Sequence, residues 1–236
     1  MGTAVGTIVP AGSNGYVWAI YAYAGNVKSK LYDGAWPSNA QDILSATGTL
    51  KANTVSSPPS VVVDSRGVVH VVYGDCNESS GVAYTRVCYK SNNTGAETYQ
   101  TNPTYLDSAK PAGVADISPT ISLETSTGNL YAFWIQNDTS MVGKVVKGAM
   151  YSSSSWTSLS LDTESTYTKQ YLTSIYSVSG ALKICWQWTQ NTTGTIQVKF
   201  DHIIPEFSEV AGPVVFLIAM FGFYNYKLKS KKNRHK

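Results

Sequence analysis

The sequence predicts an all-β protein, a β-propeller of about four blades followed by one C-terminal transmembrane helix. Three observations predict this. A strand pattern recurs four times, the 236 residues are 43% hydrophobic and 12% aromatic, and a long uncharged segment stands close to the basic end of the chain. This composition is sufficient for a sizeable core and is not that of a disordered chain.

Each copy of the strand pattern begins at a glycine: Gly15, Gly67, Gly128 and Gly180. In every copy the second, fourth and fifth residues after the glycine are apolar. The sixth residue is aromatic in all four copies: Tyr21, Tyr73, Trp134 and Trp186. A strand that is apolar on both faces needs cover on both sides, as inner strands of propeller blades have between neighbouring blades.

A hairpin precedes each of the two middle copies. Residues 59–64 (PSVVVD) match 119–124 (PTISLE), each with a proline that can start a strand and each followed by a turn glycine. Residues 171–180 are a looser copy, and the first blade is expected to lack its opening strand. The expected propeller domain is 1–204, with blades near 14–55, 56–115, 116–165 and 166–204.

The stretch "PSVVVDSRGVVHVVYGD", residues 59–75, resembles the blade repeat of sialidase-like and Asp-box-related β-propellers, and the resemblance extends over 14–204. The strict Asp-box, Ser-x-Asp-x-Gly-x-Thr-Trp, is absent, so the kinship concerns architecture. Such families usually close with six or more blades. The resemblance therefore implies either a rare four-bladed ring or the C-terminal part of a larger propeller, and the absence of an export signal in residues 1–21 favours the second.

The C-terminal region predicts a membrane anchor. Residues 210–226 carry no charge, and a helix of this length reaches about 26 Å, at the short end of what spans a bilayer. Residues 227–236 hold six Lys or Arg and no acid, which predicts a cytoplasmic tail and an extracellular body on a single-pass cell-membrane protein. The alternative is a buried core helix followed by a solvated tail.

A sorting motif is predicted at 205–209, just before this helix. Pro205, Glu206 and Phe207, then an apolar stretch and a basic end, resemble the tripartite C-terminal sorting signals of archaeal surface proteins. The resemblance implies an archaeosortase-type protease as a partner and cleavage near the motif. Four glycosylation sequons in the body fit an external location: Asn77, Asn92, Asn137 and Asn191.

The sequence supplies no recognisable catalytic set. A sialidase needs three arginines for the substrate carboxylate, and only Arg66 and Arg86 precede the anchor. A glycosidase of another kind needs two carboxylates; the candidates are Asp64, Asp75, Asp116, Glu124 and Asp138. Asp64 and Glu124 occupy equivalent turn positions, which indicates hairpin capping.

No metal, cofactor or nucleic acid is expected. The histidines, His70, His202 and His235, are too scattered for a metal site, and His70 is expected to be packed. No dinucleotide or phosphate-loop fingerprint occurs. Residues 1–209 hold 12 basic and 15 acidic residues, so the body presents no excess of positive charge. A Cys76–Cys88 disulfide is possible in an oxidising compartment, although the expected hairpin pairs each cysteine with another position.

These observations predict a non-catalytic cell-surface propeller for adhesion, for the cell envelope, or for binding glycans or envelope proteins. Three tryptophans are candidate sugar contacts: Trp36, Trp156 and Trp188. The alternative is a glycoside hydrolase or lyase, sialidase-like, whose active site is completed by further N-terminal blades. A third reading is a spacer in a larger surface assembly.

Overall fold

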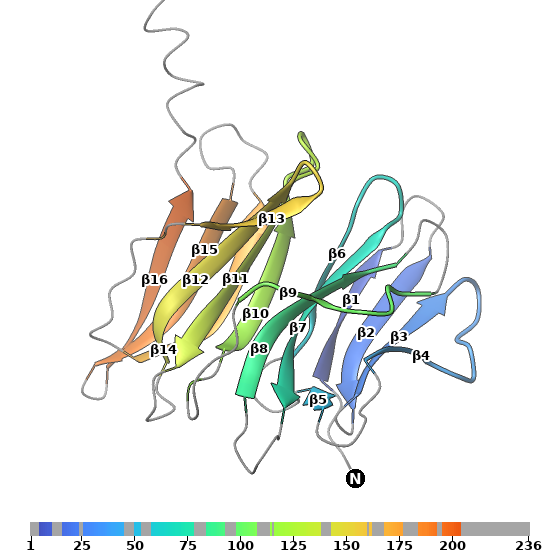
Figure 1. Cartoon of the computed structure of the whole chain (residues 1–236), viewed down its shortest axis with the longest axis horizontal. Coiled ribbons are helices and arrows are strands. Elements are labelled where there is room, and N and C mark those ends of the chain that lie inside the picture. The colour runs from blue at the N-terminus through green and yellow to red at the C-terminus, as the bar shows by residue number, and fades with distance from the viewer. Residues whose placement is uncertain are drawn as a thin grey trace, which may run out of the picture.

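The computed structural model is an all-β fold of four antiparallel sheets set side by side (Figure 1). The structure describes residues 5–10, 16–23, 26–44, 50–52, 58–77, 84–92, 98–107, 114, 116–137, 143–159, 161, 168–176, 184–192 and 195–203. Each sheet is formed from one continuous stretch of the chain. Each of the four glycine-led strand repeats lies in a different sheet.

The first sheet consists of β1 (Val5–Pro10), β2 (Val17–Tyr23), β3 (Asn26–Tyr32) and β4 (Gln41–Leu44), in that order. In the second sheet β7 (Val69–Asn77) pairs with β5 (Leu50–Ala52), β6 (Ser60–Val63) and β8 (Tyr84–Ser91), and β9 (Thr104–Tyr105) adds to β8. The expectation that the first blade lacks its opening strand is wrong, because β1 pairs with β2 along its whole length.

The third sheet has the order β10 (Asp116–Leu123), β11 (Leu130–Asn137), β12 (Gly143–Ser152) and β13 (Ser155–Leu159). The fourth sheet has the order β14 (Thr168–Tyr176), β15 (Ile184–Thr192) and β16 (Thr195–Ile203). The opening strands β1, β6, β10 and β14 contact one another in sequence order, from sheet to sheet. This is the arrangement of propeller blades around a common axis.

The apolar cores lie between neighbouring sheets. β11 is buried on both of its faces, as its sequence predicts, because the second sheet covers one face and the fourth covers the other. Tyr73 packs toward the first sheet, and Trp134 packs toward the second. The recurring aromatic position therefore faces the preceding sheet.

The first sheet departs from this rule in an informative way. Its second strand, β2, alternates between buried and half-buried residues. Trp18 and Ile20 point into the core shared with the second sheet, whereas Tyr21, at the recurring aromatic position, is half-buried. The sequence predicts the same register for all four copies, but only the face of β2 toward the second sheet is fully packed.

The turns between β6 and β7 and between β10 and β11 require glycine. Gly67 and Gly128 have φ of 80° and 78°, a region that residues with a Cβ rarely adopt. The sequence predicts that Pro119 starts a strand. In the structure it lies inside β10 instead. A β-bulge there, with Ser118 at φ 51°, lets the edge strand accommodate the missing N–H.

Cys88 is fully buried. In the β7–β8 register Cys88 lies opposite Tyr73 and Cys76 opposite Thr85, so the hairpin does not place the two cysteines opposite each other. Across the described stretches the structure contains no helix long and apolar enough to cross a membrane. The predicted anchor (210–226), sorting motif and basic tail all lie outside the described residues.

Candidate functional site

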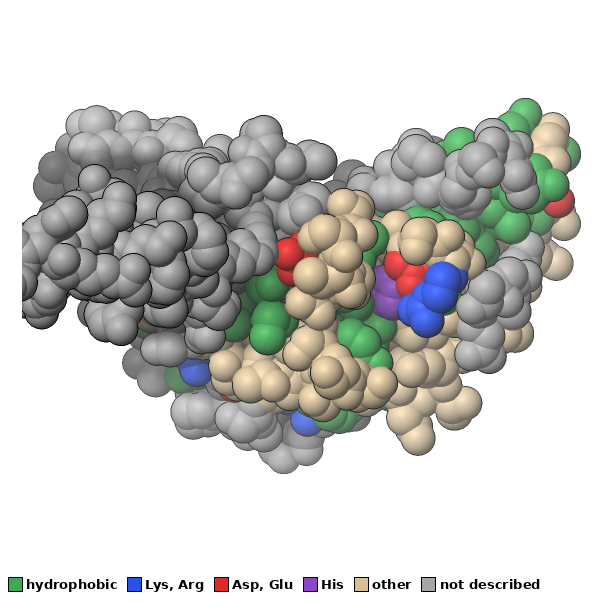
Figure 2. All heavy atoms as spheres, turned by 90° about the horizontal axis from the view of Figure 1, so that it is seen from above, with side chains coloured by type: hydrophobic (Ala, Val, Ile, Leu, Met, Phe, Trp, Pro, Cys, Tyr) green, Lys and Arg blue, Asp and Glu red, His purple; other side chains and the backbone are tan. Residues whose placement is uncertain are grey.

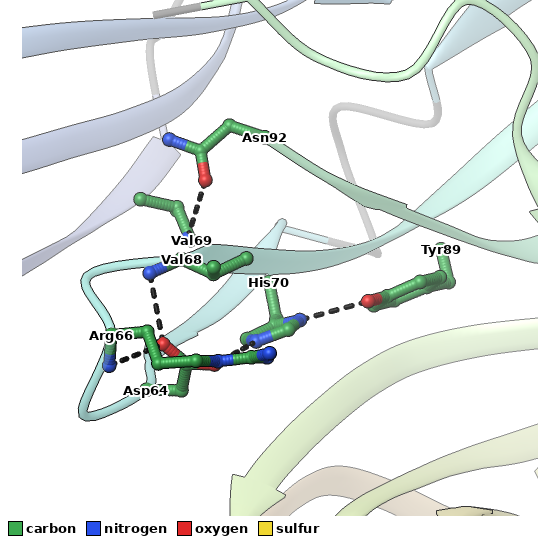
Figure 3. Close-up of polar contacts among 7 residues, drawn as sticks. All are labelled: Asp64, Arg66, Val68, Val69, His70, Tyr89 and Asn92. Atoms are coloured by element: carbon green, nitrogen blue, oxygen red, sulfur yellow. Dashed lines mark hydrogen bonds and ion pairs between the residues drawn. The ribbon is translucent and has the colours of Figure 1, made fainter. Parts of the chain in front are cut away.

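The turn between β6 and β7 is organised by one carboxylate, that of Asp64 (Figure 3). Asp64 Oδ1 accepts hydrogen bonds from the backbone N–H groups of Arg66 and Val68, both at 2.9 Å. Asp64 Oδ2 accepts from Arg66 Nε at 2.9 Å and from Arg66 Nη2 at 2.7 Å. The side chain of Asp64 is 9% exposed and that of Arg66 is 72% exposed. The turn thus holds an arginine at the surface in a fixed orientation.

Behind this ion pair lies a buried imidazole. His70 Nε2 is 3.5 Å from Asp64 Oδ2, and His70 Nδ1 is 2.8 Å from the hydroxyl oxygen of Tyr89 (Figure 3). Burial raises the pKa of Tyr89 to about 12, so its hydroxyl stays protonated at neutral pH. In the His70 tautomer that carries its proton on Nε2, that proton faces the Asp64 carboxylate and the Tyr89 hydroxyl donates to Nδ1; in the other tautomer Nδ1 donates to the hydroxyl. Asp64, His70 and Tyr89 form one polar chain from the surface into the core.

The protonation states follow from this arrangement. Burial by itself raises the pKa of Asp64, but the hydrogen bonds from Arg66 and Val68 outweigh it and hold the pKa below its usual value. Burial lowers the pKa of His70, against the opposing effect of Asp64. At neutral pH the site therefore carries an ionised carboxylate, a neutral imidazole and a protonated phenol.

The equivalent turn of the third sheet is built on Glu124. Its Oε2 accepts from the hydroxyls of Thr127 at 2.7 Å and Tyr131 at 3.2 Å, and Gly128 N–H donates to its backbone carbonyl at 2.8 Å. Tyr131 stands at the position that His70 holds in the second sheet. The capping role that the sequence predicts for Asp64 and Glu124 is what the hydrogen bonds show.

A groove of about 320 Å³ separates the two turns. We call it the turn groove; its lining residues are Asp64, Ser65, Arg66, Leu123, Thr125, Thr127 and Gly128. Figure 2 shows this face, where acidic, basic and histidine side chains gather beside the turn between β6 and β7. A guanidinium on one wall and threonine hydroxyls on the other suit a ligand that carries hydroxyl groups and an anionic group.

The three tryptophans predicted as sugar contacts have different surroundings. Trp36 is 50% exposed and packs its ring against Tyr32, with centroids 5.2 Å apart. Trp156 is only half-buried, but it lies edge-on to Tyr89 at 5.1 Å and 5.4 Å from Tyr151, as part of the core between the second and third sheets. Trp188 is on β15, and its side chain lies outside the described part.

The predicted glycosylation sites also differ. Asn92 and Asn137 are each 4% exposed, and Asn92 Oδ1 accepts a hydrogen bond from Val69 N–H at 2.7 Å. A glycan-bearing side chain has to reach solvent, so the folded domain does not favour glycosylation of Asn92 or Asn137. Asn77 ends β7 and Asn191 lies on β15, and neither side chain is among those described.

Other acids lie at the opposite end of the strands. Asp116 begins β10 and is fully buried, and Asp75 lies near the end of β7 opposite Arg86. Asp138 falls outside the described residues. No group of three potential metal ligands occurs within the described ranges.

The sequence singles out Asp64, Arg66 and His70 individually, but it does not predict the polar contacts that connect them to Tyr89. Tyr89 belongs to β8. In the β7–β8 register His70 lies opposite Ser91, so Tyr89, two residues before Ser91, is on the same face of the sheet as His70. The repeated Asp/Glu before each turn was the available signal for the cap. No comparable signal marked Tyr89, since aromatic residues are frequent throughout the chain.

No family model and no curated protein matches this chain. Solved structures do resemble it. The endo-arabinase from Bacteroides thetaiotaomicron VPI-5482 has a TM-score of 0.53 at 12% identity, over 85% of this chain and 75% of that one. The Hadza microbial sialidase Hz136 has a TM-score of 0.54 at 12% identity, over 86% of this chain but 45% of that one.

The α-L-arabinanase of Penicillium chrysogenum complexed with arabinobiose has a TM-score of 0.51 at 8% identity, over 83% of this chain and 60% of that one. The chain therefore has the fold of sialidase- and arabinanase-type β-propellers. The likeness to that architecture, expected from residues 59–75, is confirmed. At these identities the likeness establishes the fold alone.

Proposed function

We propose that this chain is a carbohydrate-active β-propeller of the glycoside hydrolase type, and that its turn groove binds a sugar residue bearing an anionic group. The observation that carries the proposal is the exposed guanidinium of Arg66, which Asp64 fixes at the edge of a groove of about 320 Å³. An arginine held in this way recognises a carboxylate with little loss of side-chain entropy.

The wall of the turn groove opposite Arg66 favours a sugar over a simple anion as the ligand. Thr125 and Thr127 supply hydroxyls, and Leu123 supplies an apolar surface. A mixture of apolar wall and converging polar groups is typical of ligand sites. Within this proposal Asp64, which lines the groove and is ionised at neutral pH, is one carboxyl of the pair that hydrolysis requires. Glu124, which is 2% exposed on the facing turn, would have to open toward the groove to supply the second.

The test measures binding and bond cleavage separately. The full-length chain is titrated with 3′-sialyllactose and with arabinobiose by calorimetry, and release of reducing sugar is followed with 3′-sialyllactose and arabinan. Arg66→Gln is expected to weaken binding of the sialylated ligand about tenfold or more, because a charge-assisted contact is lost. Absence of binding and of cleavage with every sugar would refute the proposal.

A second candidate is a non-catalytic glycan-binding propeller at the cell surface. It is favoured by the hydrogen bonds of Asp64 and Glu124, which engage both carboxylates in holding turns. Binding that depends on Arg66, without release of reducing sugar, would support this candidate over the hydrolase. Cleavage that is lost in both Asp64→Asn and Glu124→Gln would support the hydrolase.

The cell-surface location is a separate proposal that rests on the sequence. Residues 210–226 are proposed as a single-pass anchor with the body outside, and Pro205, Glu206 and Phe207 as the signal for an archaeosortase-type protease. Mass spectrometry of the native C-terminus tests the processing. A mature protein that retains the peptide ending at Lys236 would exclude cleavage at the motif.

A further inference from the structure

His70 connects the turn groove to the interior of the second sheet. It is 5% exposed and is not among the residues that line the groove. Its Nε2 lies 3.5 Å from Asp64 Oδ2, directly behind the ion pair that does line the groove (Figure 3). An effect of His70 on a bound ligand therefore passes through the charges of Asp64 and Arg66, without any contact between the imidazole and the ligand.

One oxygen atom, Asp64 Oδ2, is shared by two neighbours. It accepts hydrogen bonds from Arg66 Nε at 2.9 Å and from Arg66 Nη2 at 2.7 Å, and the same oxygen is the one nearest to His70 Nε2. Two of the five N–H donors of the guanidinium are thus engaged by Asp64. A positive charge on His70 would attract the same oxygen and weaken its hold on Arg66.

The net charge beside the groove depends on the protonation state of His70. At neutral pH Asp64 is negative, Arg66 is positive and His70 is neutral, so the charges of the three side chains cancel. An anionic ligand then meets a guanidinium whose charge is already balanced. Protonation of His70 places a positive charge 3.5 Å from the carboxylate and leaves the group with one net positive charge. Because the imidazole is buried, solvent screens this charge less than it screens an exposed one.

His70 is faced by groups from three elements. Asp64 and Arg66 belong to the turn, Tyr89 of β8 lies 2.8 Å from His70 Nδ1, and Tyr151 of β12 packs behind Tyr89 with ring centroids 6.2 Å apart. Burial raises the pKa of Tyr89 to about 12. Burial also raises the pKa of Asp64, but the hydrogen bonds that it accepts lower it further, to below 3.8. Asp64 and Tyr89 therefore keep their charge states between pH 7 and pH 5, whereas His70, with a pKa lowered from 6.5 by burial, takes up its proton on the acidic side.

We propose that His70 is the acid sensor of the turn groove, a positioning residue whose protonation tightens the binding of an anionic sugar. Protonated His70 engages part of the Asp64 carboxylate, and Arg66 then offers more of its charge to the ligand. The inference rests on the proposed function, because it concerns ligand binding at the same groove. It adds that an acidic medium favours the bound state.

The first measurement is the dissociation constant of 3′-sialyllactose at pH 7 and pH 5, determined by calorimetry with the full-length chain. The carboxylate of the ligand is ionised at both pH values. The dissociation constant is expected to be about three- to fivefold lower at pH 5, because one further positive charge acts on the ligand through partly screened surroundings. His70→Gln keeps a polar side chain that cannot take up a proton, so this variant should lose most of the change.

His202→Gln is the matched control. It is the same substitution on β16 of the fourth sheet, and it should retain the full change between pH 7 and pH 5. Glu124, on the facing turn, is present in the parent and in both variants, so any contribution of its carboxyl to the pH dependence is common to all three. The part that is lost in His70→Gln alone belongs to His70.

A second measurement leaves His70 in place. The chain has three histidines, and His202→Gln and His235→Gln identify two of the three imidazole resonances, which leaves the resonance of His70. If protonation of His70 favours the ligand, saturating 3′-sialyllactose must in turn raise the pKa of His70. A pKa that is the same with and without the ligand would overturn the inference, whether or not His70→Gln folds.

The outcomes separate this inference from the proposed function. Binding that depends on Arg66 but is equally tight at pH 7 and pH 5 would leave the proposed function standing and would refute the role of His70. Weaker binding at pH 5 would refute that role as well, since the sign is the reverse of the expected one. Absence of binding at both pH values would refute the proposed function and the inference together.

Discussion

Lys90 Nζ, on β8, donates a hydrogen bond to the backbone carbonyl oxygen of Ile43, on β4, at a distance of 2.7 Å. The same nitrogen donates to the carbonyl oxygen of Thr101 at 3.1 Å. Lys90 is 6% exposed, and burial lowers the pKa of its ammonium. One charged side chain therefore ties the outer strand of the first sheet to the second sheet.

Replacing this lysine should weaken the contact between the two sheets. Lys90→Met keeps the aliphatic stem but leaves the carbonyls of Ile43 and Thr101 without this donor, which should lower the free energy of unfolding by about 2–4 kcal/mol. Urea unfolding measures the loss. The control is Lys30→Met, whose Nζ donates to Pro37 O at 2.9 Å in a less buried setting and whose loss should cost under about 1 kcal/mol. Equal losses for both variants would contradict this role of Lys90.

The turn of the second sheet should depend on the Asp64 carboxylate rather than on its ion pair. Asp64→Ala removes the acceptor for two backbone N–H groups and should cost about 1–3 kcal/mol of stability. Arg66→Gln removes only the exposed partner of the ion pair and should lower the stability far less than Asp64→Ala does. Thermal unfolding compares the two. A larger loss for the arginine variant would show that the ion pair holds the turn.

Stability should fall on acidification, with His70 contributing first. Burial lowers the pKa of His70 in the folded protein below its usual value of 6.5, so the unfolded chain takes up this proton at higher pH than the folded chain. The contribution is complete above about pH 6.5 and is lost progressively below it. Asp64, whose pKa is lowered from 3.8, adds a second loss below about pH 4. The groups that face His70 are Asp64, Arg66 and Tyr89.

Urea unfolding at a series of pH values tests the assignment. His70→Gln keeps a polar side chain that does not titrate, so its stability should change less between pH 7 and pH 5 than that of the parent. The decline below about pH 4 should remain, because Asp64 is still present. An unchanged slope between pH 7 and pH 5 would assign the titration to another group.

Of the tryptophans predicted as sugar contacts, Trp36 should behave as a surface residue and Trp156 as a core residue when each is replaced. Trp36 is 50% exposed, so Trp36→Ala should change stability by under about 1 kcal/mol. Trp156 packs on Tyr89 and Tyr151, so Trp156→Ala should cost about 2–4 kcal/mol. Calorimetric unfolding measures both. If Trp36→Ala alone weakens sugar binding without loss of stability, the predicted contact of Trp36 gains support.

The sequence predicted those features that depend on local pattern. The glycine-led strands, their burial on two faces and the positive φ at Gly67 and Gly128 follow from spacing alone. β1 was missed because no glycine-led hairpin precedes it in the same form. Pro119 was misplaced because a bulge, which the sequence does not mark, lets proline stay within the strand.

The candidate site was predictable only in part, for a physical reason. Capping by Asp64 involves residues two and four positions away, which the sequence displays directly. The contact of His70 with Tyr89 spans 19 residues and two strands, and the turn groove combines residues of the second and third sheets. Such contacts depend on register and on sheet packing, which one sequence does not specify.

Each sheet is completed by residues that are close together in the chain, from β1–β4 to β14–β16. Pairing within a blade therefore closes only short loops and can proceed while the rest of the polypeptide is still being synthesised. Blades formed in this order would add to one another from the N-terminal side. Removing the last sheet at a boundary such as Leu161 should then leave the hydrogen-bond ladders of the earlier sheets intact, as in modular repeat arrays.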